Sequence, residues 1–331
     1  MKLRLRLKGT YYPRRAGPSI LPNAETPLSI PTYEGSNQVV HPSVIDFSLE
    51  HGIPQWHGYR YWMVLTPFPY SNDSFENPSL FVSNDGIVWT VPPNVKNPLA
   101  TAPGGMRAGF NSDPDMVYDP DADEVRIYYR FTSKEQMTLR MIRISDVTSA
   151  PVDVIKYSPW KEVDNNFRSP CIWRESTDRW HMWGGGRERA PYGIFYRFSR
   201  DGISWERPQQ CVDDLGGDPF VRSGFTNWHM SCKPDRSEGR AVFLSCAYPL
   251  ESIGLGVILH AECKNEYPTT LTTPINRPVL LPTESGWDNE TLYRCSFTLG
   301  PGNDHYNIWY SARSKNGVWK LGRTSGYVRM G

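Results

Sequence analysis

The chain has 331 residues, with 36 Lys and Arg against 35 Asp and Glu and a formal net charge of +1. Such a balance gives no electrostatic footprint for nucleic acid. No apolar run is long enough to span a membrane. The first residues alternate basic and apolar side chains, whereas a signal peptide has a continuous apolar core. We therefore expect a protein made in the cytoplasm without a signal peptide, with no nucleic-acid partner and no membrane insertion.

Residues 1–40 are predicted to form an N-terminal extension that is rich in proline. Residues 2–8 place leucines on one face of a strand and Lys or Arg on the other. This strand is either an edge strand protected by charge or a strand that docks on a partner. The remaining residues, 41–331, are expected to form one domain.

Five segments of that domain repeat one pattern, in which a short polar start runs into a strand and an aromatic-rich second strand follows after a turn. Such units, roughly sixty residues apart, indicate sheets repeated around an axis. The anchor residues at the five strand starts are His41, Asp113, Arg168, His229 and Arg294. The sequence thus predicts an all-β fold, a five-bladed β-propeller with an N-terminal strand extension.

Hairpin turns recur between the predicted strands. Ser83-Asn84-Asp85-Gly86 and Ser199-Arg200-Asp201-Gly202 are each followed by a tryptophan. Asp-Gly is a favoured hairpin dipeptide, because glycine adopts positive φ without steric cost. We expect these turns to have a structural role at the rim of the sheets.

In a propeller the first strands line a central channel, so the five anchor residues would meet at its mouth. Two interpretations remain open. Arg168 and Asp113 could pair inside the channel and hold the sheets in register. Alternatively, the residues form a polar pocket with an aromatic wall, which binds hydroxyl and carboxylate groups of a ligand. The residues predicted to bind a ligand are His41, Arg107, Arg168, Trp228, His229 and Arg294.

A metal site is a further alternative, because His41, His229 and Asp113 could approach one another across the channel. Arg168 and Arg294 would oppose a cation there. We therefore expect no metal and no other cofactor.

The strand starts, above all Ser-Asp-Pro at residues 112–114, resemble those of the propeller glycosidases of glycoside hydrolase family 43. That resemblance implies three catalytic carboxyl groups, one from each of the first three blades. Asp113 stands at the second position, but His41 stands at the first, and Arg168 or Ser169 at the third. Arginine is no general acid at neutral pH. The inherited mechanism therefore lacks two of its three carboxyl groups.

The run from His41 through Asp113 also resembles propeller proteins encoded by phages and prophages of Gram-positive bacteria. This likeness implies recognition of a bacterial surface polysaccharide, expected to be anionic, by a virion-associated protein whose N-terminal strand contacts other virion proteins. One alternative is a glycoside hydrolase with relocated carboxylates, for which Asp113, Glu76 and Glu290 are the candidates. A purely structural virion component is the other.

Overall fold

The computed structural model describes residues 18–104, 108–145, 148–157, 168–186, 191–273 and 277–328. The predicted strand at residues 2–8 lies outside them. Within the described ranges the chain forms antiparallel sheets, one short α-helix, α1 (Phe47–His51), and 3-10 turns that include η1 (Pro69–Ser71), η2 (Asp73–Phe75) and η4 (Val221–Ser223). The predicted all-β class is confirmed. No helix in the described ranges is long and apolar enough to cross a membrane.

Five sheets follow one another along the described chain. In each sheet the strands lie side by side in the order in which they occur in the sequence. The first sheet holds β1 (Val39–Asp46), β2 (Tyr61–Pro67) and β3 (Ser79–Ser83). The second holds β4 (Phe110–Asp119), β5 (Glu124–Thr132), β6 (Met137–Ile144) and β7 (Val152–Tyr157). The third holds β8 (Arg168–Ser176), β9 (Arg179–Gly185), β10 (Ile194–Ser199) and β11 (Gln209–Gln210). The fourth holds β12 (Phe225–Asp235), β13 (Arg240–Pro249) and β14 (Val257–Lys264), and the fifth holds β15 (Thr291–Leu299), β16 (His305–Arg313) and β17 (Trp319–Tyr327).

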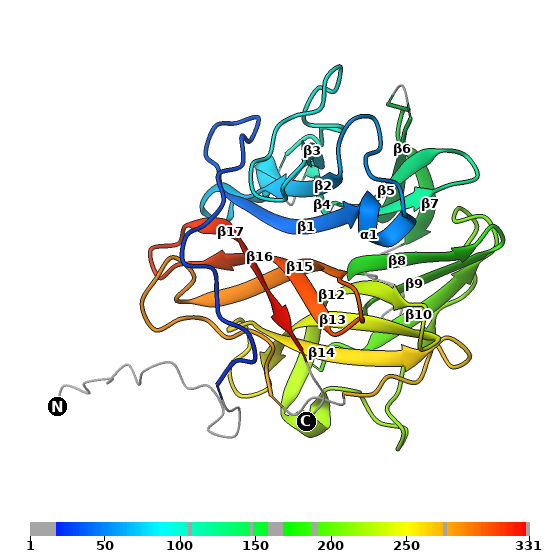
Figure 1. Cartoon of the computed structure of the whole chain (residues 1–331), viewed down its shortest axis with the longest axis vertical. Helices are drawn as coiled ribbons and strands as arrows, with labels where there is room; N and C mark the ends of the chain where they lie inside the picture. Colours follow the sequence, from blue (N-terminus) through cyan, green and yellow to red (C-terminus); the bar gives the residue numbers. More distant parts are fainter. Residues whose placement is uncertain are drawn as a thin grey trace.

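The first strands of the sheets form a closed ring. β1 packs beside β4 and β15, β8 lies between β4 and β12, and β12 packs beside β15. Figure 1 shows the sheets spread around this ring, in the radial arrangement of a β-propeller. Apolar clusters fill the spaces between neighbouring sheets, so the core is divided among the sheet interfaces.

One buried carboxylate, Asp115 on β4, joins four of the sheets near the axis. Its Oδ1 accepts hydrogen bonds from Ser43 Oγ of β1 at 2.8 Å and from Arg294 Nη2 of β15 at 3.1 Å. Its Oδ2 accepts the backbone N–H of Ile172 on β8 at 2.7 Å. Arg294 also donates to the carbonyl of Pro170 at 3.0 Å. Neither charge reaches water to any extent, so each depends on the other.

The Asp-Gly hairpins form as predicted. Asp85 Oδ1 accepts the N–H groups of Ile87 and Val88 at 2.8 Å, and Gly86 has a φ of 71°. Asp201 repeats these contacts after β10, and Gly202 has a φ of 72°. The carbonyl of Gly86 accepts Trp309 Nε1 at 2.9 Å, so this turn also fastens the first sheet to the fifth.

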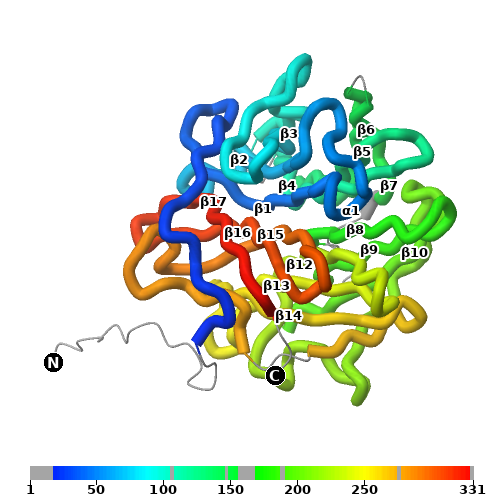
Figure 2. The backbone as a smooth tube through the Cα atoms, in the orientation of Figure 1, coloured from blue at the N-terminus to red at the C-terminus, as the bar shows by residue number. Residues whose placement is uncertain are grey.

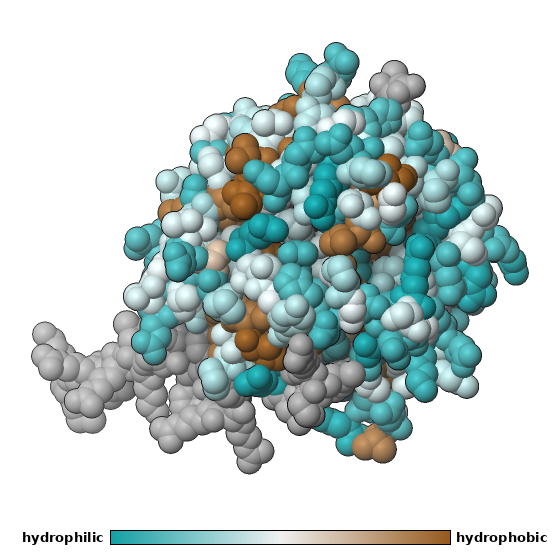
Figure 3. All heavy atoms as spheres, viewed as in Figure 1, coloured by the Kyte–Doolittle hydropathy of each residue, from teal (hydrophilic) through white to brown (hydrophobic). Residues whose placement is uncertain are grey.

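The described part of the N-terminal extension lies along the outside of the ring. Leu21 N–H bonds to the carbonyl of Val279, and Leu28 pairs with Leu321 of β17. The tube in Figure 2 shows this blue segment running past the red strands of the fifth sheet. The face in Figure 3 is largely hydrophilic, with small separate apolar patches.

Replacing Asp115 by Asn should lower the free energy of unfolding by about 3–5 kcal/mol, because Arg294 would stay buried without a counter-charge. Urea denaturation measures the change. The control is Asp178→Asn, since Asp178 and Arg200 form an exposed pair at 3.8 Å and its loss should cost less than about 1 kcal/mol. Equal, small effects of both variants would show that the axial pair does not hold the sheets.

Candidate functional site

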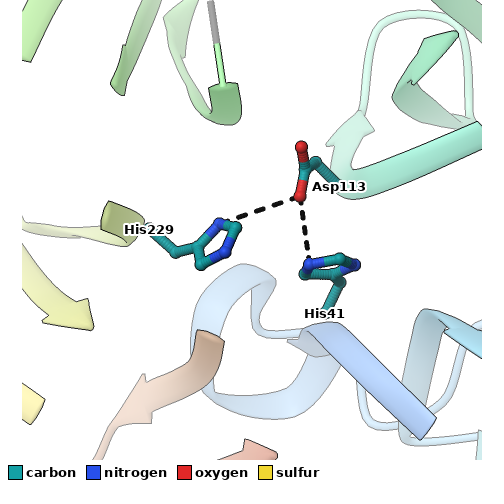
Figure 4. Close-up of side chains that lie close together, drawn as sticks. All are labelled: His41, Asp113 and His229. Atoms are coloured by element: carbon teal, nitrogen blue, oxygen red, sulfur yellow. Dashed lines mark ion pairs between the residues drawn. The ribbon is translucent and has the colours of Figure 1, made fainter. Parts of the chain in front are cut away.

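Three buried side chains lie close together, each from the first strand of a different sheet: His41 of β1, Asp113 of β4 and His229 of β12 (Figure 4). His41 Nε2 lies 3.1 Å and His229 Nδ1 lies 3.7 Å from Asp113 Oδ1. One nitrogen or oxygen from each residue falls within 4.8 Å of the others, which is the spacing of atoms that could share a metal ion.

Irregular strand starts turn these side chains inward. The strand register shifts between Val40 and Ser43 in β1 and between Ser112 and Asp115 in β4. His41 and Asp113 have φ values of 58° and 54°, in the left-handed region that residues with a side chain rarely adopt. Each such residue costs on the order of 1–3 kcal/mol, and such strain gathers at functional sites.

The two oxygens of Asp113 have different partners. Oδ1 faces the two imidazoles, whereas Oδ2 lies 3.0 Å from Arg130 Nη2 of β5. Burial alone would raise the pKa of Asp113, but Arg130 and the neighbouring His41 hold it well below its ordinary value. Asp113 is therefore ionised, with Oδ1 open towards the cluster.

Both imidazoles are neutral near pH 7. Burial lowers the pKa of His41 to about 4, although the charge of Asp113 opposes this. Burial likewise lowers the pKa of His229 well below its ordinary value. His41 Nδ1 lies 3.1 Å from Thr66 Oγ1 and 3.4 Å from Glu76 Oε1, so its outer nitrogen has oxygen partners.

This donor set fits a divalent cation. The buried Nε2 of His41, the nitrogen that faces Asp113, makes no hydrogen bond in the described part of the chain. Two neutral imidazoles and one carboxylate are common ligands of Zn²⁺ and other transition metals, and such histidines usually give their second nitrogen to an outer oxygen. The argument against a metal assumed that Arg168 and Arg294 both face these ligands, whereas the guanidinium of Arg168 lies over Trp228. Arg294 donates to Asp115, so it is paired away from them as well.

Glu76 stands beside this cluster in the segment between η2 and β3, where Asn111 N–H bonds to its carbonyl at 3.1 Å. Burial and then the charge of Asp113 raise its pKa well above the ordinary value. A carboxyl of raised pKa can take up and return a proton near neutral pH. Glu76 and Asp113 thus have pKa values moved in opposite directions by their surroundings.

An aromatic wall borders the histidines. The Tyr293 ring lies 4.3 Å from the ring of His229 and 5.2 Å from that of His41. Trp228 Nε1 donates to the Tyr293 hydroxyl at 3.1 Å, which leaves the phenolic proton free to be donated elsewhere. The guanidinium of Arg168 lies over Trp228, 4.9 Å from the ring centroid.

Ser169, completely buried at the start of β8, contacts His229 through Oγ and Nδ1. A Ser-His-Asp relay needs serine and aspartate on opposite nitrogens of the imidazole. Here Ser169 and Asp113 both face Nδ1. The arrangement is therefore not that of a serine nucleophile.

The structure separates the predicted site residues into groups. His41, Asp113, His229 and Glu76 lie together, with Trp228 and Arg168 at the wall. Of the two open interpretations, the Arg168–Asp113 pair does not form, because Asp113 pairs with Arg130 instead. Glu290 is engaged by Arg313 through two contacts of 2.8 Å, and Arg107 lies outside the described residues.

The sequence did not point to Arg130 or Tyr293. It also could not decide whether Arg168 or Ser169 faces the cluster at the start of β8. Ser169 precedes a proline, as His41 and Asp113 do, and this shared Pro was the available signal. Arg130 lies on a second strand, where the repeat of strand starts carries no information.

No protein-family model matches the chain. It is 27% identical over 330 residues to the A type blood N-acetyl-α-D-galactosamine deacetylase of Flavonifractor plautii; the match covers 85% of this chain and 40% of that protein's length. The chain therefore spans well under half of the curated relative. A crystal structure of an N-acetylgalactosamine deacetylase from F. plautii, in complex with blood group B trisaccharide, is similar with a TM-score of 0.77 and 22% identity, over 93% of this chain and 96% of that chain.

More distant structures share the fold. β-1,2-Mannobiose phosphorylase from Listeria innocua matches with a TM-score of 0.60 and 12% identity, over 91% of this chain and 94% of that chain. The α-L-arabinofuranosidase PaAbf62A from Podospora anserina matches with a TM-score of 0.59 and 9% identity, over 93% and 98%. The expected likeness to glycoside hydrolase propellers is thus confirmed at the level of the fold.

The predicted main function, glycan recognition by a virion-associated phage protein, is wrong. The curated relative is an enzyme, a carbohydrate deacetylase, and the solved structures named above are carbohydrate-active enzymes. These comparisons give no link to phages or virion proteins. They favour the enzymatic alternative instead.

We expect the purified, metal-free protein to bind one divalent cation, because the donor atoms of two neutral imidazoles and one ionised carboxylate lie close together. Calorimetric titration with Co²⁺ should show a single site, and Asp113→Asn should weaken it by roughly tenfold or more. Asp178→Asn, which alters an exposed carboxylate, is the control. Unchanged binding by the Asp113 variant would place the cation elsewhere.

Proposed function

We propose that the protein is a divalent-cation-dependent deacetylase that removes an acetyl group from an N-acetylated sugar of a glycan. The observation that carries this proposal is the His41–Asp113–His229 cluster, in which two neutral imidazoles and one carboxylate oxygen face one another. The relative from F. plautii, named as an N-acetylgalactosamine deacetylase, supports the substrate class. We also propose that the five described sheets are the complete set of blades of a five-bladed propeller.

His41, Asp113 and His229 would hold the cation. A cation bound there would polarise the amide carbonyl and increase the acidity of a nearby water. Arg130 keeps Asp113 ionised and holds its Oδ2, so that Oδ1 points to the cluster. Thr66 fixes the ring of His41 through Nδ1.

Glu76 is the proton carrier of the proposed reaction. Its carboxylate takes a proton from the attacking water, whose oxygen adds to the acetyl carbon, and gives the proton to the departing nitrogen as the C–N bond breaks. The products are the free amino sugar and acetate. The Tyr293 hydroxyl stays protonated, since burial and Asp113 raise its pKa, and it can donate to the carbonyl oxygen as negative charge develops.

A glycan ending in N-acetylgalactosamine, compared with the same glycan ending in galactose, tests the proposal directly. The cation-loaded protein should release acetate and leave a free amine only on the first, as mass spectrometry would show. Release of a monosaccharide from either glycan would instead establish a glycoside hydrolase. The opposite pKa shifts of Glu76 and Asp113 favour that second candidate, since glycosidases pair a protonated with an ionised carboxyl group. A glycosidase of this kind would keep its activity in the presence of a chelator.

Glu76→Gln should lower kcat on the acetylated glycan by roughly 10²–10⁴-fold, because general acid–base catalysis contributes about that much. Cation binding, measured by calorimetry, should persist. Glu262→Gln, which alters a carboxylate paired with Arg240 on the fourth sheet, is the matched control. Wild-type turnover by the Glu76 variant would exclude it as the proton carrier.

Tyr293→Phe removes a single hydroxyl and keeps the ring against both histidines. The loss of one donor to a developing oxyanion typically costs on the order of 10²–10³-fold in kcat. We expect that loss with little change in KM, measured by steady-state kinetics of acetate release. A change confined to KM would mean that the hydroxyl binds the sugar and does not stabilise the transition state.

A further inference from the structure

We infer that Ser169 is the fourth protein ligand of the cation site, supplied by the third sheet through its hydroxyl oxygen. The inference rests on the proposed cation-dependent function and adds to it a residue that the cluster of His41, Asp113 and His229 does not include.

The first reason is positional. The register shifts between Arg168 and Cys171 in β8, as it does at the starts of β1 and β4. Ser169 lies inside this shift with a φ of 46°, beside the values of 58° for His41 and 54° for Asp113. Each of the three precedes a proline, which disfavours helical backbone for the residue before it. Each of the first three sheets therefore has one polar residue in the same rare backbone conformation at the start of its first strand.

The second reason is the direction of the side chain. Ser169 Oγ contacts His229 Nδ1, and the same nitrogen is the one that lies 3.7 Å from Asp113 Oδ1. The hydroxyl is therefore on the edge of the imidazole that faces the carboxylate, and not on its outer edge. An oxygen that served only to orient His229 would be expected on the nitrogen away from the cluster, where Thr66 stands for His41.

The third reason is electrostatic. One oxygen of Asp113 already pairs with Arg130, whose Nη2 lies 3.0 Å from Oδ2. A neutral hydroxyl adds an oxygen donor without the cost of burying a further charge. Serine hydroxyls bind Mg²⁺ in phosphate-binding loops, so the chemistry has a precedent among divalent cations.

Replacing Ser169 by Cys and loading with Co²⁺ alone tests the inference without any turnover. A thiolate bound to Co²⁺ gives an intense ligand-to-metal absorption band that oxygen and nitrogen ligands do not give. We expect this band in Ser169→Cys, and not in the wild type or in Ser311→Cys. Ser311 is a buried serine of β16 that bonds to the carbonyl of Arg294 and serves as the matched control.

Calorimetry with Co²⁺ completes the test. Ser169→Ala should bind Co²⁺ about tenfold or more weakly. Weak binding by Ser169→Ala without the band in Ser169→Cys would reduce Ser169 to a residue that positions His229, and would overturn its role as a ligand. Wild-type binding by Ser169→Ala would overturn it as well. A wild-type protein that binds no Co²⁺ would instead contradict the proposed function itself.

Discussion

The carboxylate of Asp115 is the interaction on which the rest of the structure depends. It is buried on the axis and bonds to Ser43, Ile172 and Arg294, so the second sheet is tied to the first, third and fifth at one point. This bond also has an electrostatic consequence for the site. Burial lowers the pKa of both His41 and His229, and the charge of Arg294 acts in the same direction. Arg294 itself is paired with Asp115, so the pair that joins the sheets also places a buried arginine next to the two histidines.

In the candidate site, the two oxygens of Asp113 have different partners. Arg130 engages Oδ2 of Asp113 and keeps the group ionised, while Oδ1 remains for the cluster. Glu76 lies on the other side of His41 from Asp113. Burial and the negative charge of Asp113 raise the pKa of Glu76, which favours its protonated form. Two carboxyl groups of similar ordinary pKa thus acquire different roles from their surroundings. Strained backbone at His41, Asp113 and Ser169 indicates that this geometry is held by the fold against local preference.

Much of the fold could be predicted from the sequence, because the strand starts repeat and Asp-Gly marks the hairpins. Those starts also placed His41, Asp113 and His229 at one mouth. The sequence could not decide between Arg168 and Ser169, since a one-residue change of register reverses the direction of a side chain and the register shift in β8 is not visible in the letters. It also could not show that Arg294 turns to Asp115, because a long arginine side chain reaches several partners. The expectation of no metal rested in part on that placement, and the likeness to phage proteins led to the wrong main function.

The central claim is that one divalent cation is held between His41, Asp113 and His229. The most direct measurement is a crystal structure of the Co²⁺-loaded protein, with an anomalous difference map calculated from data collected on both sides of the cobalt absorption edge. The account predicts a single strong peak within bonding distance of Asp113 Oδ1 and of one nitrogen of each histidine. The absence of a peak there, in crystals of protein that deacetylates its glycan, would contradict the account.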